Sequence, residues 1–278
     1  MEGRPVGPSP GQEPGEVSEP SLRKEALLAS LTTRSLGRKL FLFEELDSTN
    51  ACARTLADSG IEEGTVVIAE YQTSGRGRQG RIWMSERGKN LLLSIVFRPP
   101  PEAPMWQLPF LLSEGAARGV EHVIGTRVHT KWPNDLVLNG RKCAGILVEQ
   151  SASEGAATAI AGIGINVNQS AFPEELAITA TSLKIASGRS VDRLQLFQTV
   201  LASIESLYEA MIRGSGEILM KEWKQRCVTF GRKITIEHGN ERLEGVALGL
   251  NEEGGLIVDL PGGPRTVYAG DVTITETR

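Results

Sequence analysis

Two short segments of the sequence carry side chains that could bind a phosphate or carboxylate. The first lies in residues 72–90, which we call the arginine loop, where five basic residues accompany a single acidic one. Arginine forks bind phosphate and carboxylate through paired hydrogen bonds, and the interleaved glycines let backbone amides approach the same anion. Because the whole chain has a formal charge of −4, this predicts a local anion site rather than a general attraction to nucleic acid.

Residues 75–80, Gly-Arg-Gly-Arg-Gln-Gly, also satisfy the GxGxxG pattern of dinucleotide-binding proteins. That pattern requires a helix directly after the glycines, whereas residues 81–90 contain Trp83 and Gly88 and run into an apolar strand. No GxxxxGK[ST] P-loop occurs either. The pattern therefore does not indicate a Rossmann fold; a solvated flexible loop and an RNA-binding Arg-Gly segment remain open alternatives.

The second segment is Lys131-Trp132-Pro133-Asn134-Asp135, directly before a predicted hairpin. Its carboxylate could bind Mg²⁺ and its lysine could neutralise phosphate, as phosphate chemistry requires. The alternative is a capped turn held in place by the tryptophan. Lys142 supplies a second cation across the hairpin, beside the small residues Ala144 and Gly145, which would let a ligand lie against the backbone.

Residues 162–166, Gly-Ile-Gly-Ile-Asn, end a predicted strand. Glycines at such a place allow close approach of another group, and the Asn166 amide offers both a donor and an acceptor to an adenine edge. Tight packing or a bulge would explain the glycines equally well.

Composition bounds the class of protein. The 278 residues are 40% hydrophobic and 23% charged, which is typical of a globular chain and excludes full-length disorder and a collagen repeat. Three widely spaced cysteines without a CxxC pair indicate reduced thiols and a cytoplasmic protein rather than a disulfide framework or a zinc site. No signal peptide, membrane span or GxSxG elbow is present.

The predicted elements form an α+β fold, with a mixed β-sheet, flanking helices and a small C-terminal SH3-like β-barrel. We divide the chain into a disordered tail (1–20), a helical lead-in (21–38), a catalytic domain (39–227) and the barrel (228–278). Asn139-Gly140 predicts a type I′ hairpin turn. The expected strands are 39–46, 65–71, 91–97, 142–149 and 157–166, and the expected helices are 22–36, 49–59, 106–123 and 194–212.

Taken together, several motifs resemble the biotin protein ligases in wording, order and spacing. They are residues 47–50, 69–72, 75–81, 131–135, 141–149 and 162–166, together with Trp83. The likeness covers about residues 39–278, and one departure is Gln79, where the family often has arginine. The resemblance implies a class II aminoacyl-tRNA synthetase/biotin ligase-like fold. It also implies an enzyme that makes biotinyl-5′-AMP from biotin and ATP and then transfers the biotinyl group to a lysine of a carrier protein.

The same resemblance assigns roles to residues. Arg78 and Lys142 would be catalytic, holding the biotin carboxylate and the α-phosphate together, and Asp135 would bind Mg²⁺. The biotin-binding residues would be Ser48, Thr49, Asn50, Gln72, Gly75, Arg76, Arg78, Lys142 and Gly145. The ATP-binding residues would be Arg78, Arg81, Trp83, Lys131, Asn134 and Asn166.

The implied acceptor is the biotin carboxyl carrier protein of acetyl-CoA carboxylase or a related carboxylase, and the implied enzyme is a monomer or homodimer. Some family members carry an N-terminal winged helix; about 36 residues before the catalytic core, of which 20 look disordered, cannot supply one, so no DNA binding is expected. A lipoate or octanoate transferase and a non-catalytic biotin or nucleotide sensor are the competing functions.

Overall fold

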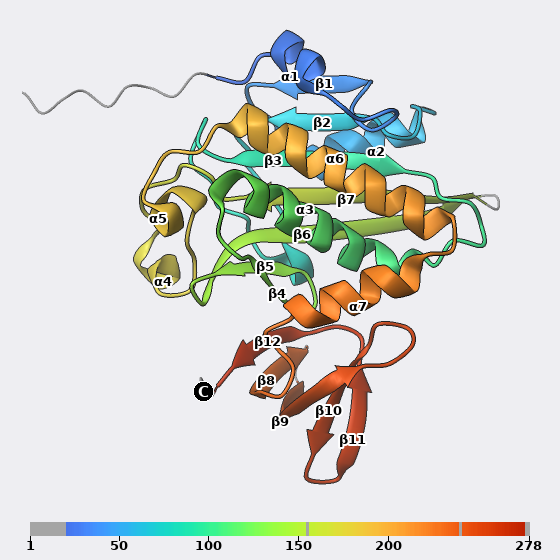
Figure 1. The fold of residues 1–278 in the computed structure, drawn as a ribbon, viewed down its shortest axis with the longest axis vertical. Helices are drawn as coiled ribbons and strands as arrows, with labels where there is room; N and C mark the ends of the chain where they lie inside the picture. The colour runs from blue at the N-terminus through green and yellow to red at the C-terminus, as the bar shows by residue number, and fades with distance from the viewer. Residues whose placement is uncertain (1–20, 154–155, 239–240, 276–278) are drawn as a thin grey trace, which may run out of the picture.

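A computed structural model describes residues 21–153, 156–238 and 241–275. The tail predicted for residues 1–20 lies outside these ranges. Within them the chain forms a seven-stranded sheet and a five-stranded sheet joined by helices, as Figure 1 shows. The predicted α+β class with a mixed main sheet is confirmed.

The main sheet has the strand order β1-β2-β3-β7-β6-β5-β4. Only the β1–β2 pair is parallel, and every other neighbouring pair is antiparallel. The strands are β1 (Leu40–Phe43), β2 (Val66–Ala69), β3 (Leu91–Phe97), β4 (His129–Lys131), β5 (Asp135–Leu138), β6 (Arg141–Ser153) and β7 (Ala156–Ile165). The arginine loop joins β2 to an antiparallel neighbour and contains only a short 3₁₀ turn, Arg78–Gly80, so it opens no α-helix and the GxGxxG pattern is not a Rossmann turn.

Long helices cover the two faces of this sheet. Helices α3 (Leu108–Ile124) and α6 (Arg193–Ile212) lie together over one face, and α2 (Thr49–Asp58) packs on the other through Ala53 and Ala57. The apolar stripe predicted on residues 194–212 faces the core. Helices α3 and α6 touch closely because Gly119 has no Cβ; one placed there would lie 2.7 Å from the Val200 Cα.

The C-terminal sheet has the order β11-β10-β9-β8-β12 and is antiparallel throughout. Its strands are β8 (Lys233–His238), β9 (Glu241–Leu250), β10 (Leu256–Leu260), β11 (Gly263–Val267) and β12 (Asp271–Ile274). Trp132 fastens it to the main sheet: the indole is buried among C-terminal apolar residues and its Nε1 donates to the Gly254 carbonyl at 3.2 Å. Trp223 of α7 (Gly216–Arg226) packs in the same cluster.

The helix predicted for residues 22–36 is present but shorter than predicted, because α1 spans only Lys24–Ser30. Beyond it, the backbone N–H groups of Arg34, Ser35 and Leu36 donate to the Glu205 carboxylate of α6 at 2.7–2.9 Å. A distant carboxylate has therefore taken the donors that a continuing helix would have used. The sequence prediction also missed α7, the short helices α4 (Glu174–Ala177) and α5 (Leu183–Ser187), the 3₁₀ turn Met105–Gln107 and strand β4.

Other local predictions are confirmed. Asn139 and Gly140 both have positive φ, 49° and 77°, as a type I′ turn requires. The three cysteines are free thiols, and burial raises the pKa of Cys143 to about 12, which leaves it inert. Across the described ranges, no helix is both long and apolar enough to cross a membrane.

Glu205 provides a test of how the lead-in is held. Burial alone would raise the pKa of this carboxyl, but the donated N–H bonds outweigh it and keep the pKa below its ordinary value. Replacing it, Glu205→Gln, should lower the free energy of unfolding by about 1–3 kcal/mol at pH 7. A depressed folded-state pKa stabilises the protein above the unfolded pKa, so the gap between wild type and variant should close as the pH falls below about 4. Urea denaturation at pH 7 and pH 3.5 measures the difference in the free energy of unfolding between the two proteins at each pH. A difference that does not change with pH would contradict this account.

Candidate functional site

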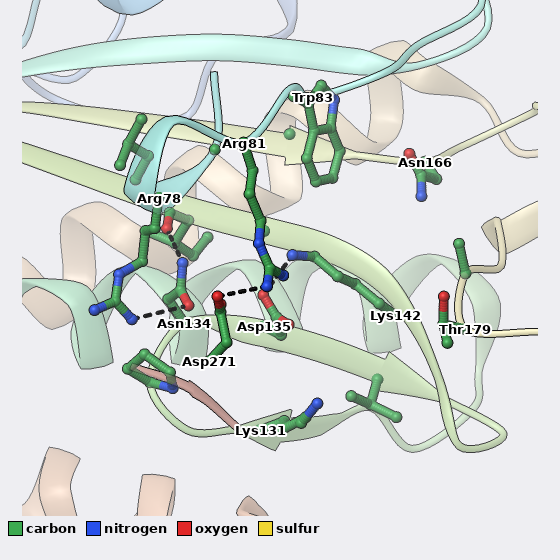
Figure 2. A pocket seen from close by; sticks show the side chains of 18 of the residues that line it. Arg78, Arg81, Trp83, Lys131, Asn134, Asp135, Lys142, Asn166, Thr179 and Asp271 are labelled. Carbon is green, nitrogen blue, oxygen red and sulfur yellow. Dashed lines mark hydrogen bonds and ion pairs between the residues drawn. The ribbon is translucent and has the colours of Figure 1, made fainter. Parts of the chain in front are cut away.

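A cavity of about 700 Å³ opens between the edge of the main sheet and the C-terminal sheet, within the size range of small-molecule sites. Figure 2 shows its cationic part. The predicted site residues that line it are Ser48, Thr49, Asn50, Gln72, Arg76, Arg78, Arg81, Trp83, Lys131, Asn134, Asp135, Lys142, Gly145 and Asn166. The structure thus brings together residues from five separate parts of the chain.

Gly75 is the predicted site residue that does not line the cavity. Its carbonyl accepts the Trp83 N–H at 2.9 Å, and a Cβ at this position would lie 2.6 Å from the Trp83 carbonyl oxygen. Gly75 therefore lies where the two arms of the arginine loop approach each other closely. Arg87 and Lys89 also lie outside the cavity; Arg87 pairs with Glu45 and stacks over Tyr71.

Lys142 is positioned by an irregularity in the sheet. Leu136 pairs with Ala144 but Val137 pairs with Lys142, so Cys143 is an extra residue in β6. Such bulges re-aim the neighbouring side chain. The Lys142 backbone then bonds to a different segment, donating to the Thr179 carbonyl and accepting from the Thr181 N–H, each at 2.8 Å. The lysine is thereby fixed at the cavity wall by backbone on both sides.

Two cations of the cavity, Lys142 and Arg81, each pair with a carboxylate that also lines it, as Figure 2 shows. The Lys142 ammonium lies 2.6 Å from the Asp135 carboxylate, and the Arg81 guanidinium lies 2.5 Å from Asp271 on β12. These side chains are partly exposed, between 20% and 63%, so solvent screens both pairs. Screened pairs contribute little stability. A phosphate entering the cavity can therefore take over these cations at small cost.

Arg78 and Lys131 are more deeply placed. Burial lowers the pKa of Arg78 from its ordinary value, with Asp271 and Asp135 acting in the opposite direction. Burial likewise lowers the pKa of Lys131, opposed by Asp135 and reinforced by Lys142. The shifts mean that these cations lack enough negative charge around them in the free protein, so an anionic ligand would bind them favourably.

The segment 131–135 serves two sides of the molecule. Lys131, Asn134 and Asp135 line the cavity, while the Trp132 indole between them lies buried against the C-terminal sheet. Asn134 is fixed between Arg78, which donates to its Oδ1 at 3.5 Å, and the Ile146 carbonyl. The tryptophan-held turn expected from the sequence is therefore present, and the polar residues of the same segment line the cavity; their role in binding stays a prediction.

A second region of the cavity is uncharged. Ser48 caps the start of α2, and Gln72 Oε1 accepts from the Thr49 N–H at 2.7 Å and from its hydroxyl at 3.0 Å. Asn50 donates to Glu149 at 2.7 Å and accepts from the Ser94 hydroxyl at 2.6 Å. This network presents neutral donors and acceptors in fixed orientations, as recognition of an uncharged polar head group requires.

The glycines predicted to admit a ligand instead receive protein side chains. A Cβ at Gly164 would lie 2.6 Å from the Trp83 indole, and one at Gly145 would lie 3.0 Å from the same ring. At Gly162 the neighbour is the Asn50 amide. The glycines therefore seat the indole flat against β6 and β7, where the ring becomes part of the cavity wall.

Two buried polar atoms at this wall have no hydrogen-bond partner among the described residues: Trp83 Nε1 and Asn166 Oδ1. The Asn166 Nδ2 already donates to the Thr181 carbonyl at 3.1 Å, so its oxygen alone is available. An unsatisfied buried polar group costs about 1–3 kcal/mol, which a ligand donor would recover. An amino group such as that of adenine suits the asparagine oxygen.

Sequence reasoning missed the contribution of the C-terminal sheet and of residues 172–180. Asp271, Arg232 and Glu237 come from the C-terminal strands and their connections, and Ile178 stands at the cavity with 81% of its surface exposed. Nothing in the local sequence around Asp271 marks it as a partner of Arg81, because about 190 residues separate the two. The packing of the C-terminal sheet against the rest of the molecule, to which Trp132 and Trp223 contribute, brings them together.

The carboxylates of the cavity could bind a metal ion only together with a substrate that supplies further ligands. No group of three or more His, Cys, Asp or Glu that could hold an ion occurs among the residues described. Mg²⁺ is commonly bound by one or two carboxylates together with substrate phosphates. Asp135 has the chemistry for that role, and a Mg²⁺ ion there would compete with Lys142 for the carboxylate.

Comparison with known proteins agrees with this geometry. Residues 42–166 match the model of the biotin/lipoate A/B protein ligase family, and residues 229–274 match the biotin protein ligase C terminal domain. The bifunctional ligase/repressor BirA of Bacillus spizizenii is 34% identical, covering 95% of this chain and 81% of that protein. The biotin--[acetyl-CoA-carboxylase] ligase of Paracoccus denitrificans is also 34% identical, covering 81% of this chain and 96% of the relative.

A solved structure shares the fold. The biotin protein ligase from Aquifex aeolicus in complex with biotin and ATP superimposes with a TM-score of 0.74 at 28% identity, covering 86% of this chain and all of that one. Three findings lead to one conclusion. Relatives above 30% identity cover at least 81% of both chains, the C-terminal domain matches, and the fold is shared. The chain belongs to the biotin protein ligases, within the biotin/lipoate A/B protein ligase family.

Proposed function

We propose that this chain is a biotin--[acetyl-CoA-carboxylase] ligase that activates biotin with ATP and transfers it to a carrier-protein lysine. The observation that carries the proposal is the division of one cavity into a neutral end, formed by the start of α2 and Gln72, and a cationic end, formed by Arg78, Arg81 and Lys142. Biotin has the same division, with an uncharged ureido head and a carboxylate tail.

In the first step a biotin carboxylate oxygen attacks the α-phosphorus of ATP, forming biotinyl-5′-AMP and releasing pyrophosphate. Both reactants are anions and repel each other. Lys142 and Arg78 both line the cationic end of the cavity, so we assign them to holding the carboxylate and the α-phosphate within reacting distance. Catalysis is then mainly positioning and charge stabilisation.

The nucleotide needs further contacts. We assign the adenine to the Trp83 indole and the unpaired Asn166 Oδ1, and the phosphates to Arg81, Lys131 and Asn134. A Mg²⁺ ion held by Asp135 and the phosphates would supply additional neutralisation of the leaving pyrophosphate. Once a phosphate takes Arg81 from Asp271, the arginine loop is free to settle over the adenylate and exclude water.

In the second step the acceptor lysine nitrogen attacks the acyl carbon, an amide forms and AMP leaves. The names of the Paracoccus denitrificans and Mycobacterium tuberculosis relatives specify acetyl-CoA carboxylase, so we propose the biotin carboxyl carrier protein of that enzyme as the acceptor. The exposed apolar Ile82 and Ile178 at the cavity mouth suit a surface that another protein or the closing loop covers.

Substrate choice tests the proposal directly. The purified protein with ATP and Mg²⁺ should release pyrophosphate when biotin is added and should label the carrier domain on a streptavidin blot. Lipoate and octanoate lack a ureido group, so the neutral donors would be left unpaired and turnover should fall at least about a hundredfold. Turnover with lipoate alone would make the chain a lipoate transferase, and biotin binding without labelling would make it a sensor.

The catalytic cations give a second test. Lys142→Ala should slow biotinyl-AMP formation at least about a hundredfold, because it removes a charge that the transition state needs. Arg78→Ala should in addition release the adenylate faster. Arg87→Ala is the matched control, since this arginine belongs to the same loop but lies outside the cavity. Pre-steady-state kinetics give the rate of adenylate formation in all three variants and the rate of adenylate release in Arg78→Ala. Rates equal to those of Arg87→Ala would place the site elsewhere.

The packing of the Trp83 indole against Gly164 gives a third test of the proposal. Gly164→Val should push the indole away from β7 and raise the KM for ATP at least about tenfold, while the KM for biotin changes less. Gly249→Val, at a β9 position where a Cβ would have no neighbouring atom within 4 Å, should leave both values unchanged. A variant that loses biotin and ATP affinity equally would contradict an adenine role for this wall.

A further inference from the structure

A buried ion pair lies at the base of the arginine loop, away from the cavity. Glu70 follows directly after β2, and Arg193 is the first residue of α6. Arg193 donates to the Glu70 carboxylate through NH1 at 2.5 Å and NH2 at 3.3 Å, and both side chains are only 2–3% exposed. Neither residue lines the cavity, so any effect on the reaction must act through the loop.

This pair fixes both ends of the loop at one point. The Glu70 carbonyl accepts the Gly88 N–H at 3.0 Å, and Arg193 also donates to the carbonyl of Asn90, the last loop residue, at 3.2 Å. The Asn90 side chain in turn accepts the Val167 N–H at 3.0 Å, next to the site residue Asn166. The two ends of the arginine loop and the cavity wall around Asn166 are therefore held by one connected set of contacts.

The N-terminal segment reaches the same carboxylate. The Leu22 N–H donates to Glu70 Oε1 at 2.6 Å, and the Leu22 side chain is buried in the main core. Helix α1 begins two residues later, lies beside β1 at that end of the sheet, as Figure 1 shows, and also packs against α6. A displacement of residues 21–23 must therefore alter the surroundings of Glu70.

We propose that Glu70 and Arg193 are positioning residues that hold the arginine loop for adenylate retention, and that the Leu22 N–H couples the N-terminal segment to that loop. A desolvated ion pair that loses one of its partners is left with an uncompensated charge, so the pair resists small displacements. The other ion pairs of the loop, Arg81 with Asp271 and Arg87 with Glu45, are partly exposed, whereas the pair at its base is buried, so we expect the closed position of the loop to depend on this base. The inference rests on the proposed function, because its main readout is retention of biotinyl-AMP.

The test compares the rate at which bound biotinyl-AMP leaves Glu70→Gln, Arg193→Lys, Leu22→Pro and wild type, at a temperature where each is folded. Glu70→Gln should release the adenylate at least about fivefold faster, and Leu22→Pro, which removes the N–H donor together with the buried leucine side chain, should do so by a smaller factor. Arg193→Lys, which keeps the charge but not the fork, should fall between wild type and Glu70→Gln.

Two controls separate positioning from general destabilisation. Glu114→Gln breaks an equally buried pair with Arg226, which lies between α3 and α7 and touches no loop residue, so it should lower the Tm without faster release. Leu22→Ala removes most of the buried side chain and leaves the Leu22 N–H in place, so its release rate should equal that of wild type.

Release rates for Glu70→Gln and Leu22→Pro equal to those of their controls would overturn the inference. If Glu70→Gln does not fold, Leu22→Pro and Arg193→Lys decide it on the same readout. If wild type forms no biotinyl-AMP, the proposed function fails instead. Amide exchange of residues 72–90 in the free protein then tests the inference: faster exchange in Leu22→Pro than in Leu22→Ala supports it, and equal exchange overturns it.

Discussion

The repulsion between like charges is the constraint on which this structure depends. Arg78, Arg81, Lys131 and Lys142 converge on one cavity in a chain whose net charge is negative. The free protein tolerates the convergence because Asp135 and Asp271 pair with two of these cations and Asn134 accepts from a third. These contacts are partly exposed and weak, so the cations are already oriented for a phosphate and a carboxylate that would otherwise repel each other. Preorganised charge of this kind is a large contribution to catalysis.

The scaffold positions these charges through a few local devices. The extra residue in β6 directs Lys142 into the cavity, and alternation along residues 131–135 directs Lys131 to the cavity and Trp132 to the C-terminal sheet. Because Trp132 fastens that sheet, Asp271 arrives within reach of Arg81. The C-terminal sheet therefore forms part of the cavity, and the segment to which we assign phosphate binding also holds the two sheets together.

Much of this could be predicted from the sequence, since local patterns carried it. The main strands, the long helix α6 and the Asn139-Gly140 turn follow from short-range signals, and the clustering of the motif residues follows from the resemblance to the biotin protein ligases. The failures have long-range causes. The lead-in helix ends early because Glu205, about 170 residues away, takes its N–H donors, and Asp271 reaches Arg81 only through tertiary packing. The glycines at 145 and 164 correctly indicated close approach, but the approaching group is Trp83.

The most direct test of the central claim is a crystal structure of this chain with a stable analogue of biotinyl-AMP. The account predicts that the phosphate lies within hydrogen-bonding distance of Lys142 and Arg78, that the Arg81–Asp271 pair is broken, and that the ureido ring contacts the start of α2. A structure in which the Lys142–Asp135 and Arg81–Asp271 pairs are intact and the phosphate lies outside the cationic end of the cavity would contradict it.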